Sequence, residues 1–179
     1  MSIENKQSNF LTIFYVALTC ILLGGFIGAT TNMINASVSP YYFKAVMHWD
    51  FEDIWVASVA QGILEGLIYG VIFGLMFTTG FGLITKGQAP YRFAFIQLLK
   101  ITALVFACWA AGGLLAMLLA TLSSNFYKGH FPLAPSDKVE LLKFAWVGGS
   151  IWGGMIGGLL SSVLGVVVVK NSWTKLIIT

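Results

Sequence analysis

Residues 54–84 read IWVASVAQGILEGLIYGVIFGLMFTTGFGLI, and this stretch decides the fold. It is apolar over more than the roughly 20 residues that a helix needs to cross a bilayer. Glycine recurs at every fourth position, at Gly62, Gly66, Gly70 and Gly74. Four-residue spacing aligns these glycines on one helix face. The stretch therefore predicts a membrane-spanning helix that packs closely against a neighbour through small residues.

Three further apolar stretches of spanning length flank this one, at residues 10–34, 93–122 and 142–169. Hydrophobic residues make up 58% of the 179-residue chain and charged residues only 9%, whereas a soluble domain carries roughly 25% charged residues. The apolar runs are continuous rather than alternating, which indicates helices and not barrel strands. We expect an all-α polytopic membrane protein, with residues 1–179 forming a single four-helix transmembrane domain.

The length and flanks of the spans predict their geometry and orientation. As one helix, residues 54–84 would extend roughly 46 Å, so we expect tilt, protrusion or a break near residues 78–82. The first span lacks a cleavage pattern and is expected to be an uncleaved anchor. Lysine and arginine near the span ends favour cytoplasmic N- and C-termini by a small margin. The residues on that side are Lys6, Lys86, Arg92, Lys170 and Lys175, against Lys44, Lys128, Lys138 and Lys143 on the other.

The small-residue pattern occurs twice, which predicts two parallel-repeat hairpins at about residues 10–84 and 93–169. A shift of 88 residues superposes the first span on the third, pairing Cys20 with Cys108, Gly24 with Gly112 and Gly28 with Ala116. A shift of 91 residues superposes the second span on the fourth, pairing Trp55 with Trp146 and Gly66 with Gly157. Chance alignment of glycine-rich helices is the alternative to duplication.

We call a helix face that carries small residues at every fourth position a glycine ladder. We expect glycine-ladder packing on all four spans, with the small-residue faces of the first repeat meeting those of the second. Ladders on every span exceed what one monomer needs, so we expect partners in the membrane, either other subunits or further copies of the chain. The packing residues that we predict are Gly24, Gly28, Gly62, Gly66, Gly70, Gly74, Gly112, Gly149, Gly153, Gly157 and Gly165.

A polar stripe runs beside the first ladder. Ser58, Gln61, Glu65 and Tyr69 follow one another at spacings of three, four and four residues, and therefore share a helix face. Side chains lean towards the helix N-terminus, so Tyr69 is expected to approach Glu65, and Glu65 to approach Gln61. In the 91-residue register, the second repeat has Gly149, Trp152, Ile156 and Leu160 at these positions. The polar stripe therefore belongs to one hairpin only.

Glu65 is the strongest functional candidate, because an ionisable group inside a span costs roughly 2.5–3.5 kcal/mol or more. Three readings stay open: a protonated carboxyl that fixes helix register, an ion or proton site, and a contact to a subunit or lipid headgroup. Lys100 is the candidate counter-charge, although it could instead reach the membrane surface. Thr30, Thr31 and Asn32 are the other candidate neighbours.

The outer loops, at about residues 35–53 and 123–141, are long and aromatic. Such residues favour the headgroup level, so we expect short interfacial helices or turns, with a partner-docking surface as the alternative. His48 and His130 lie in these loops without a metal-ligand spacing. We expect Cys20 and Cys108 to be packing residues.

Neither a nucleotide-binding loop nor a nucleophile with a companion base occurs in the sequence, so we expect no enzymatic activity, catalytic residue, cofactor or metal. The net charge of +3 includes no basic block, and we expect no nucleic-acid partner. Two function classes remain. The first is a small structural or accessory subunit of a membrane complex or homo-oligomer. The second is a proton or small-ion channel or carrier that uses the polar stripe.

Overall fold

The computed structural model describes the backbone of residues 3–178 and the side chains of residues 10–176. This part of the chain is entirely helical. Four long helices contain segments apolar enough to cross a membrane, at Phe10–Val38, Ile54–Thr85, Tyr91–Leu122 and Lys138–Leu176. The helices are α1 (Ile3–Val38), α2 (Pro40–Val46), α3 (Ile54–Thr85), α4 (Tyr91–Leu122), α5 (Ser124–His130) and α6 (Lys138–Ile178).

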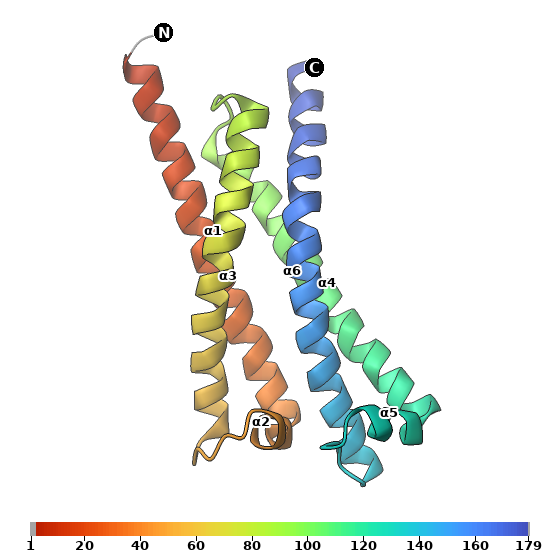
Figure 1. Ribbon diagram of the computed structural model, residues 1–179. Coiled ribbons are helices and arrows are strands. Elements are labelled where there is room, and N and C mark those ends of the chain that lie inside the picture. Colours follow the sequence, from red (N-terminus) through yellow and green to blue (C-terminus); the bar gives the residue numbers. More distant parts are fainter. Residues whose placement is uncertain (1–2, 179) are drawn as a thin grey trace.

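The long helices form two antiparallel hairpins that lie side by side (Figure 1). In the first hairpin α1 packs along α3, and in the second α4 packs along α6. Both termini and the turn between α3 and α4 lie at one end, which we call the terminal end. The short helices α2 and α5 lie at the other end, which we call the loop end.

Helix α3 runs without interruption through residues 78–82, so the break that the sequence allowed is absent. Thr78 donates its hydroxyl proton to Gly74 O at 2.6 Å, and Thr79 donates to Leu75 O at 2.7 Å. These bonds satisfy the hydroxyls within the helix itself. The helix ends at Thr85, and the next two residues, Lys86 and Gly87, have positive φ angles of 50° and 70°.

The small-residue faces meet within each hairpin, so the expectation that they join one repeat to the other is wrong. A Cβ added at Gly24 would overlap Gly66 O of α3 and lie 2.8 Å from Gly70 Cα. In the second hairpin, a Cβ added at Gly112 would overlap Gly149 O and lie 2.7 Å from Gly153 Cα. Successive helices carry matching glycine faces, and such faces let two backbones touch.

Contacts between the hairpins are concentrated at the two ends. A terminal-end cluster buries Val16 of α1, Phe77 and Phe81 of α3, Leu98 of α4 and Val169 of α6. A loop-end cluster draws on all six helices, and its buried members are Ala36, Tyr42, Phe43, Ile54, Ala120, Tyr127, Leu141, Phe144, Ala145 and Val147. The two clusters hold the hairpins together at either end of the bundle.

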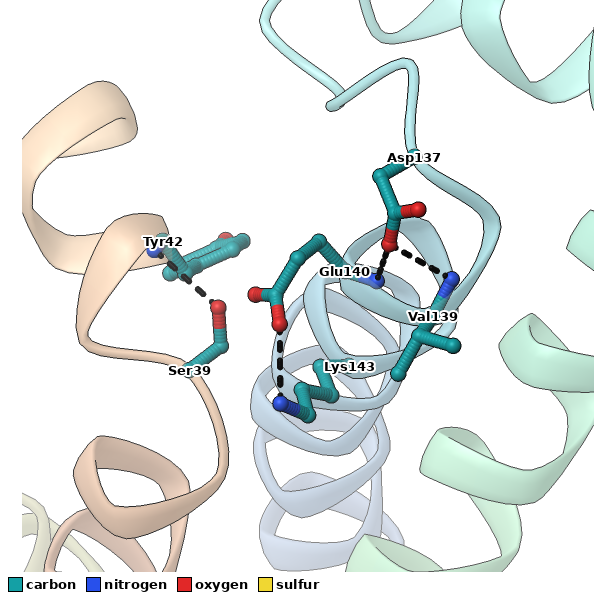
Figure 2. Close-up of polar contacts among 6 residues, drawn as sticks. All are labelled: Ser39, Tyr42, Asp137, Val139, Glu140 and Lys143. Carbon is teal, nitrogen blue, oxygen red and sulfur yellow. Dashed lines mark hydrogen bonds and ion pairs between the residues drawn. The ribbon is translucent and has the colours of Figure 1, made fainter.

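Polar caps fix the start of helices at the loop end (Figure 2). Ser39 Oγ accepts a hydrogen bond from Tyr42 N at 3.4 Å, next to Pro40 at the first position of α2. Asp137 Oδ1 accepts from Val139 N and Glu140 N, both at 3.0 Å, at the start of α6. These acceptors satisfy N–H groups that have no partner within the helix. Both connecting segments therefore contain a short helix, one of the two forms expected from the sequence.

Tyr127 of α5 gives the loop end a pH dependence. Burial, with a smaller contribution from the charge of Tyr42, raises the pKa of Tyr127 to about 12 from an ordinary value of 10.0. The unfolded chain loses this proton first, so the associated stability is fully present below about pH 10 and is lost as the pH rises towards 12. We expect the free energy of unfolding of the wild-type protein to fall more steeply over this interval than that of Tyr127→Phe. Denaturant titrations at a series of pH values measure both slopes, and equal slopes would contradict the assignment.

Candidate functional site

A cavity of about 240 Å³ separates the two hairpins between the end clusters. All four long helices line it. On α1 the lining extends from Cys20 to Asn35, and on α3 from Gly62 to Met76. At 1.5 Å per helical residue, both segments are roughly 21 Å long or slightly more. The cavity is therefore long and narrow, and it follows the helices.

The cavity opens sideways between α3 and α6. Tyr69 and Ile72 of α3 lie on one side of this opening, and Met155 and Leu159 of α6 lie on the other. All four side chains are exposed, whereas the lining residues Asn35, Leu98 and Ser161 are buried. The opening thus faces the surroundings of the bundle at the middle of two candidate membrane spans.

The predicted polar stripe divides between the packed interior and the opening. Ser58 is buried and donates its hydroxyl proton to Trp55 O at 2.9 Å. Gln61 Nε2 donates to Glu65 Oε1, which is the contact expected from the direction of the side chains. Glu65 itself is exposed and lines the cavity. Tyr69 also lines the cavity, but among the described residues it forms no hydrogen bond with Glu65.

The other expected neighbours of Glu65 bond elsewhere. Lys100 Nζ donates to Gln97 Oε1 at 3.3 Å, nearer the terminal end of α4, and so does not form an ion pair with Glu65. Asn32 Nδ2 donates to Ser58 O at 3.0 Å. Thr30 and Thr31 donate to backbone carbonyls of α1. Within residues 10–176, Gln61 is therefore the hydrogen-bond partner of the Glu65 carboxyl.

The glycines make equivalent contacts in the two hairpins. The shift that relates these contacts in α3 to those in α6 differs from the 91-residue shift used to align the two spans in sequence. Gly24 rests on Gly66 and Gly70, whereas Gly112 rests on Gly149 and Gly153, so corresponding glycines of α3 and α6 lie 83 residues apart. The cysteines follow the same register, with Cys20 against Gly74 and Cys108 against Gly157.

The glycine contacts therefore match in a register that lies two helical turns away from the 91-residue alignment. Glycine ladders with four-residue spacing superpose equally well after shifts of four or eight residues, so the ladder alone cannot select the register. The contacts pair Glu65 with Gly148 rather than with Ile156. A Cβ added at Gly148 would lie 3.2 Å from the ring of Tyr42, so this position packs against the other hairpin. The carboxyl has no polar counterpart in either register.

Three polar groups around the cavity were missed as site residues at the level of sequence. Asn35 Nδ2, Trp109 Nε1 and Ser161 Oγ are buried without a hydrogen-bond partner among the described residues, and all three residues line the cavity. Asn35 and Ser161 are 0% exposed, and Trp109 is 8% exposed. The sequence places Asn35 at the start of the first outer loop, outside the first span, and Ser161 among the small residues of the fourth span. Nothing in the sequence indicates that the Trp109 N–H lacks an acceptor.

The end of the cavity nearest the terminal end is closed by apolar side chains. Phe77 stacks on Phe73 and Phe81, with ring centroids 5.5 and 6.1 Å away. Phe77, Phe81 and Leu98 are almost completely buried. Buried apolar side chains therefore lie between the cavity and the terminal end. The described residues contain no group of three His, Cys, Asp or Glu side chains that could hold a metal ion.

The fold and its four candidate spans define a class, the multi-pass helical membrane proteins. Comparison of the chain with protein-family models, curated proteins and solved structures finds no match.

Proposed function

We propose that this protein is a non-enzymatic subunit of a membrane assembly, formed either with other membrane proteins or with further copies of itself. The observation that carries the proposal is the exposure of Glu65 on α3, within a candidate span and with Gln61 as its hydrogen-bond partner. A carboxyl that faces hydrocarbon in this way costs a few kcal/mol. A neighbouring transmembrane helix that covers Glu65 and hydrogen-bonds its second oxygen would remove that cost.

The architecture that we infer for this subunit is a pair of parallel-repeat hairpins, each closed by a glycine ladder. The equivalent environments of Gly24 and Gly112, and of Cys20 and Cys108, support a duplication. Because the hairpins are closed internally, the outer faces of all four helices are left for partners. The distribution of lysine and arginine supports cytoplasmic termini.

Ion or proton transport is the second candidate function, because Glu65 lines a cavity within the bundle. The buried side chains of Phe77, Phe81 and Leu98 argue against it, since a permeant ion would have to cross an apolar barrier next to the cavity. The accessory-subunit function needs no such path and is the one we favour.

Substitutions at Glu65 test the proposal. We expect Glu65→Leu to weaken association with the partner by about 3- to 20-fold, the range given by transmembrane hydrogen bonds of roughly 0.6–1.7 kcal/mol. Glu65→Gln keeps a hydrogen-bonding group of the same size and should retain the partner. Purification in mild detergent, followed by native mass spectrometry, measures the stoichiometry of each form.

Proton flux into liposomes separates the two candidate functions. If wild-type protein conducts and Glu65→Gln abolishes conduction without changing assembly, the accessory-subunit proposal fails. If wild-type vesicles show no flux and the same partner always copurifies, the transport proposal fails. A wild-type protein that is monomeric and without partners in mild detergent would also contradict the accessory function.

A further inference from the structure

We propose that the cavity between the hairpins holds one lipid acyl chain, whose carbonyl accepts a hydrogen bond from Asn35 Nδ2. Glu65 lies exposed on α3 and lines the opening of the same cavity, whereas Asn35 is buried near the loop end of α1. The acyl-chain site does not require that a partner covers Glu65.

The size and shape of the cavity favour a chain. Its volume of about 240 Å³ exceeds the roughly 150 Å³ of an engineered apolar cavity that accepts benzene. It is smaller than the roughly 300–1,000 Å³ typical of pockets for compact drug-sized ligands. The lining follows α1 and α3 for roughly 21 Å, so the space is extended along the helices. One linear hydrocarbon chain fits such a space better than a compact ring.

The lining is predominantly apolar, which favours hydrocarbon over water. Leu23, Phe73, Leu98, Val105 and Ile151 come from all four long helices. A water molecule needs two to four polar partners, and these five side chains offer none. An empty space would forfeit dispersion contacts along all four helices. The opening between α3 and α6 gives a chain in the surrounding bilayer a lateral way in.

Asn35 determines where the polar end of the ligand would lie. The single hydroxyl proton of Ser150 is within reach of both Asn35 Oδ1 and Val147 O, each 3.0 Å from Oγ, while Asn35 Nδ2 has no hydrogen-bond partner among the described residues. A buried donor without an acceptor is destabilising. Asn35 is near the loop end of α1, where a bilayer passes from hydrocarbon to headgroups. Carbonyl groups of lipids lie at this boundary, so an ester or carboxyl oxygen can meet Nδ2 while its chain follows the cavity.

The two other unpaired groups do not determine the ligand. Ser161 is helical, and its hydroxyl can turn to the carbonyl four residues earlier, as Ser162 does with Gly158 O at 3.0 Å. Trp109 carries a second donor farther along the cavity and provides a comparison for Asn35.

Native mass spectrometry of the full chain tests occupancy. We expect the wild-type protein to retain one lipid at collision energies that remove detergent. Gly158 lines the cavity, and a Cβ added there meets nothing within 4 Å, so Gly158→Leu should fill the space without disturbing the packed faces. We expect it to lower lipid occupancy at least about tenfold. Gly82→Leu is the matched control, because Gly82 lies outside the cavity and its added Cβ would meet only Ile13 at 3.8 Å. It should retain lipid as the wild type does.

Three probes added to delipidated protein identify the chemistry: dioleoyl phosphatidylcholine, its diether analogue with the same chains, and oleic acid. The diester should bind about 2- to 10-fold more tightly than the diether, which lacks carbonyl groups. This preference should disappear in Asn35→Leu and persist in Trp109→Phe. Retention of oleic acid in place of the phospholipid would support the acyl-chain site and identify the free acid as its source.

Four outcomes would overturn the proposal. They are a wild-type protein without retained lipid, unchanged occupancy in Gly158→Leu, equal binding of diester and diether to the wild type, and an ester preference that depends on Trp109 but not on Asn35. A transmembrane segment of a partner that crosslinks to cavity residues while lipid is absent would replace the acyl chain as the occupant.

Discussion

Gly66→Leu is expected to open the α1–α3 hairpin and to produce the largest loss of stability of any single substitution considered. Even the first carbon of a side chain at this position would overlap Gly24 O and lie 3.1 Å from Gly25 Cα. Both obstacles are backbone atoms, so no rotamer change can relieve them. Overpacking costs about 1–3 kcal/mol where side chains can adjust, and here the two helices must separate. We expect a loss above that range, measured as the free energy of unfolding in detergent or bicelles.

Gly158→Leu is the matched control for this prediction. It places the same side chain at a glycine of a membrane-spanning helix, but a Cβ there meets nothing within 4 Å. Leucine also has a higher helix propensity than glycine. We expect the stability of Gly158→Leu to equal or exceed that of the wild type. Equal losses in the two variants would show that close backbone packing does not stabilise the hairpin.

Phe77→Ala is expected to lower the free energy of unfolding by about 3–5 kcal/mol. Phe77 is 0% exposed and stacks between Phe73 and Phe81 in the terminal-end cluster. A Cβ added at Gly165 of α6 would lie 3.7 Å from its ring, so Phe77 also joins the two hairpins. Its truncation removes contacts within α3 and across the seam, and leaves a void in a close-packed region.

Phe26→Ala is the control for Phe77→Ala. Phe26 lies on α1 within a candidate span, but its side chain is 59% exposed. Its truncation removes contacts with lipid rather than with the cluster, so we expect a loss below about 1 kcal/mol. A similar loss in both variants would mean that the terminal-end cluster does not join the hairpins.

Much of the fold followed from local features of the chain. Continuous apolar runs are long enough to predict spanning helices, and the structure has four such helices near the expected boundaries. The bond between Gln61 and Glu65 was also accessible, because residues four apart on a helix face are neighbours whatever surrounds them. Both results depend on one helix at a time.

Features that depend on two helices were harder to predict. The glycine faces were expected to join the repeats, but they close each hairpin internally. The sequence alignment of the second span with the fourth differs by two helical turns from the register in which their glycine contacts match, since small residues at every fourth position align in several registers. The positions of Lys100 and Glu65 along their spans allowed the two side chains to approach each other. In the structure the Lys100 ammonium instead bonds to Gln97. The positions of small and charged residues along the chain do not determine which neighbouring helix each residue contacts.

The sequence by itself determined four membrane-length helices, a small-residue face on each of them and a carboxyl at Glu65 inside the second span. Helical period and the hydrocarbon solvent are sufficient for these conclusions. Only the tertiary structure decided that the hairpins separate between their end clusters, that Glu65 lies exposed on α3, and that Asn35 faces the intervening cavity without an acceptor. A cavity exists where neighbouring helices fail to touch, and this depends on crossing geometry and side-chain packing among all four helices.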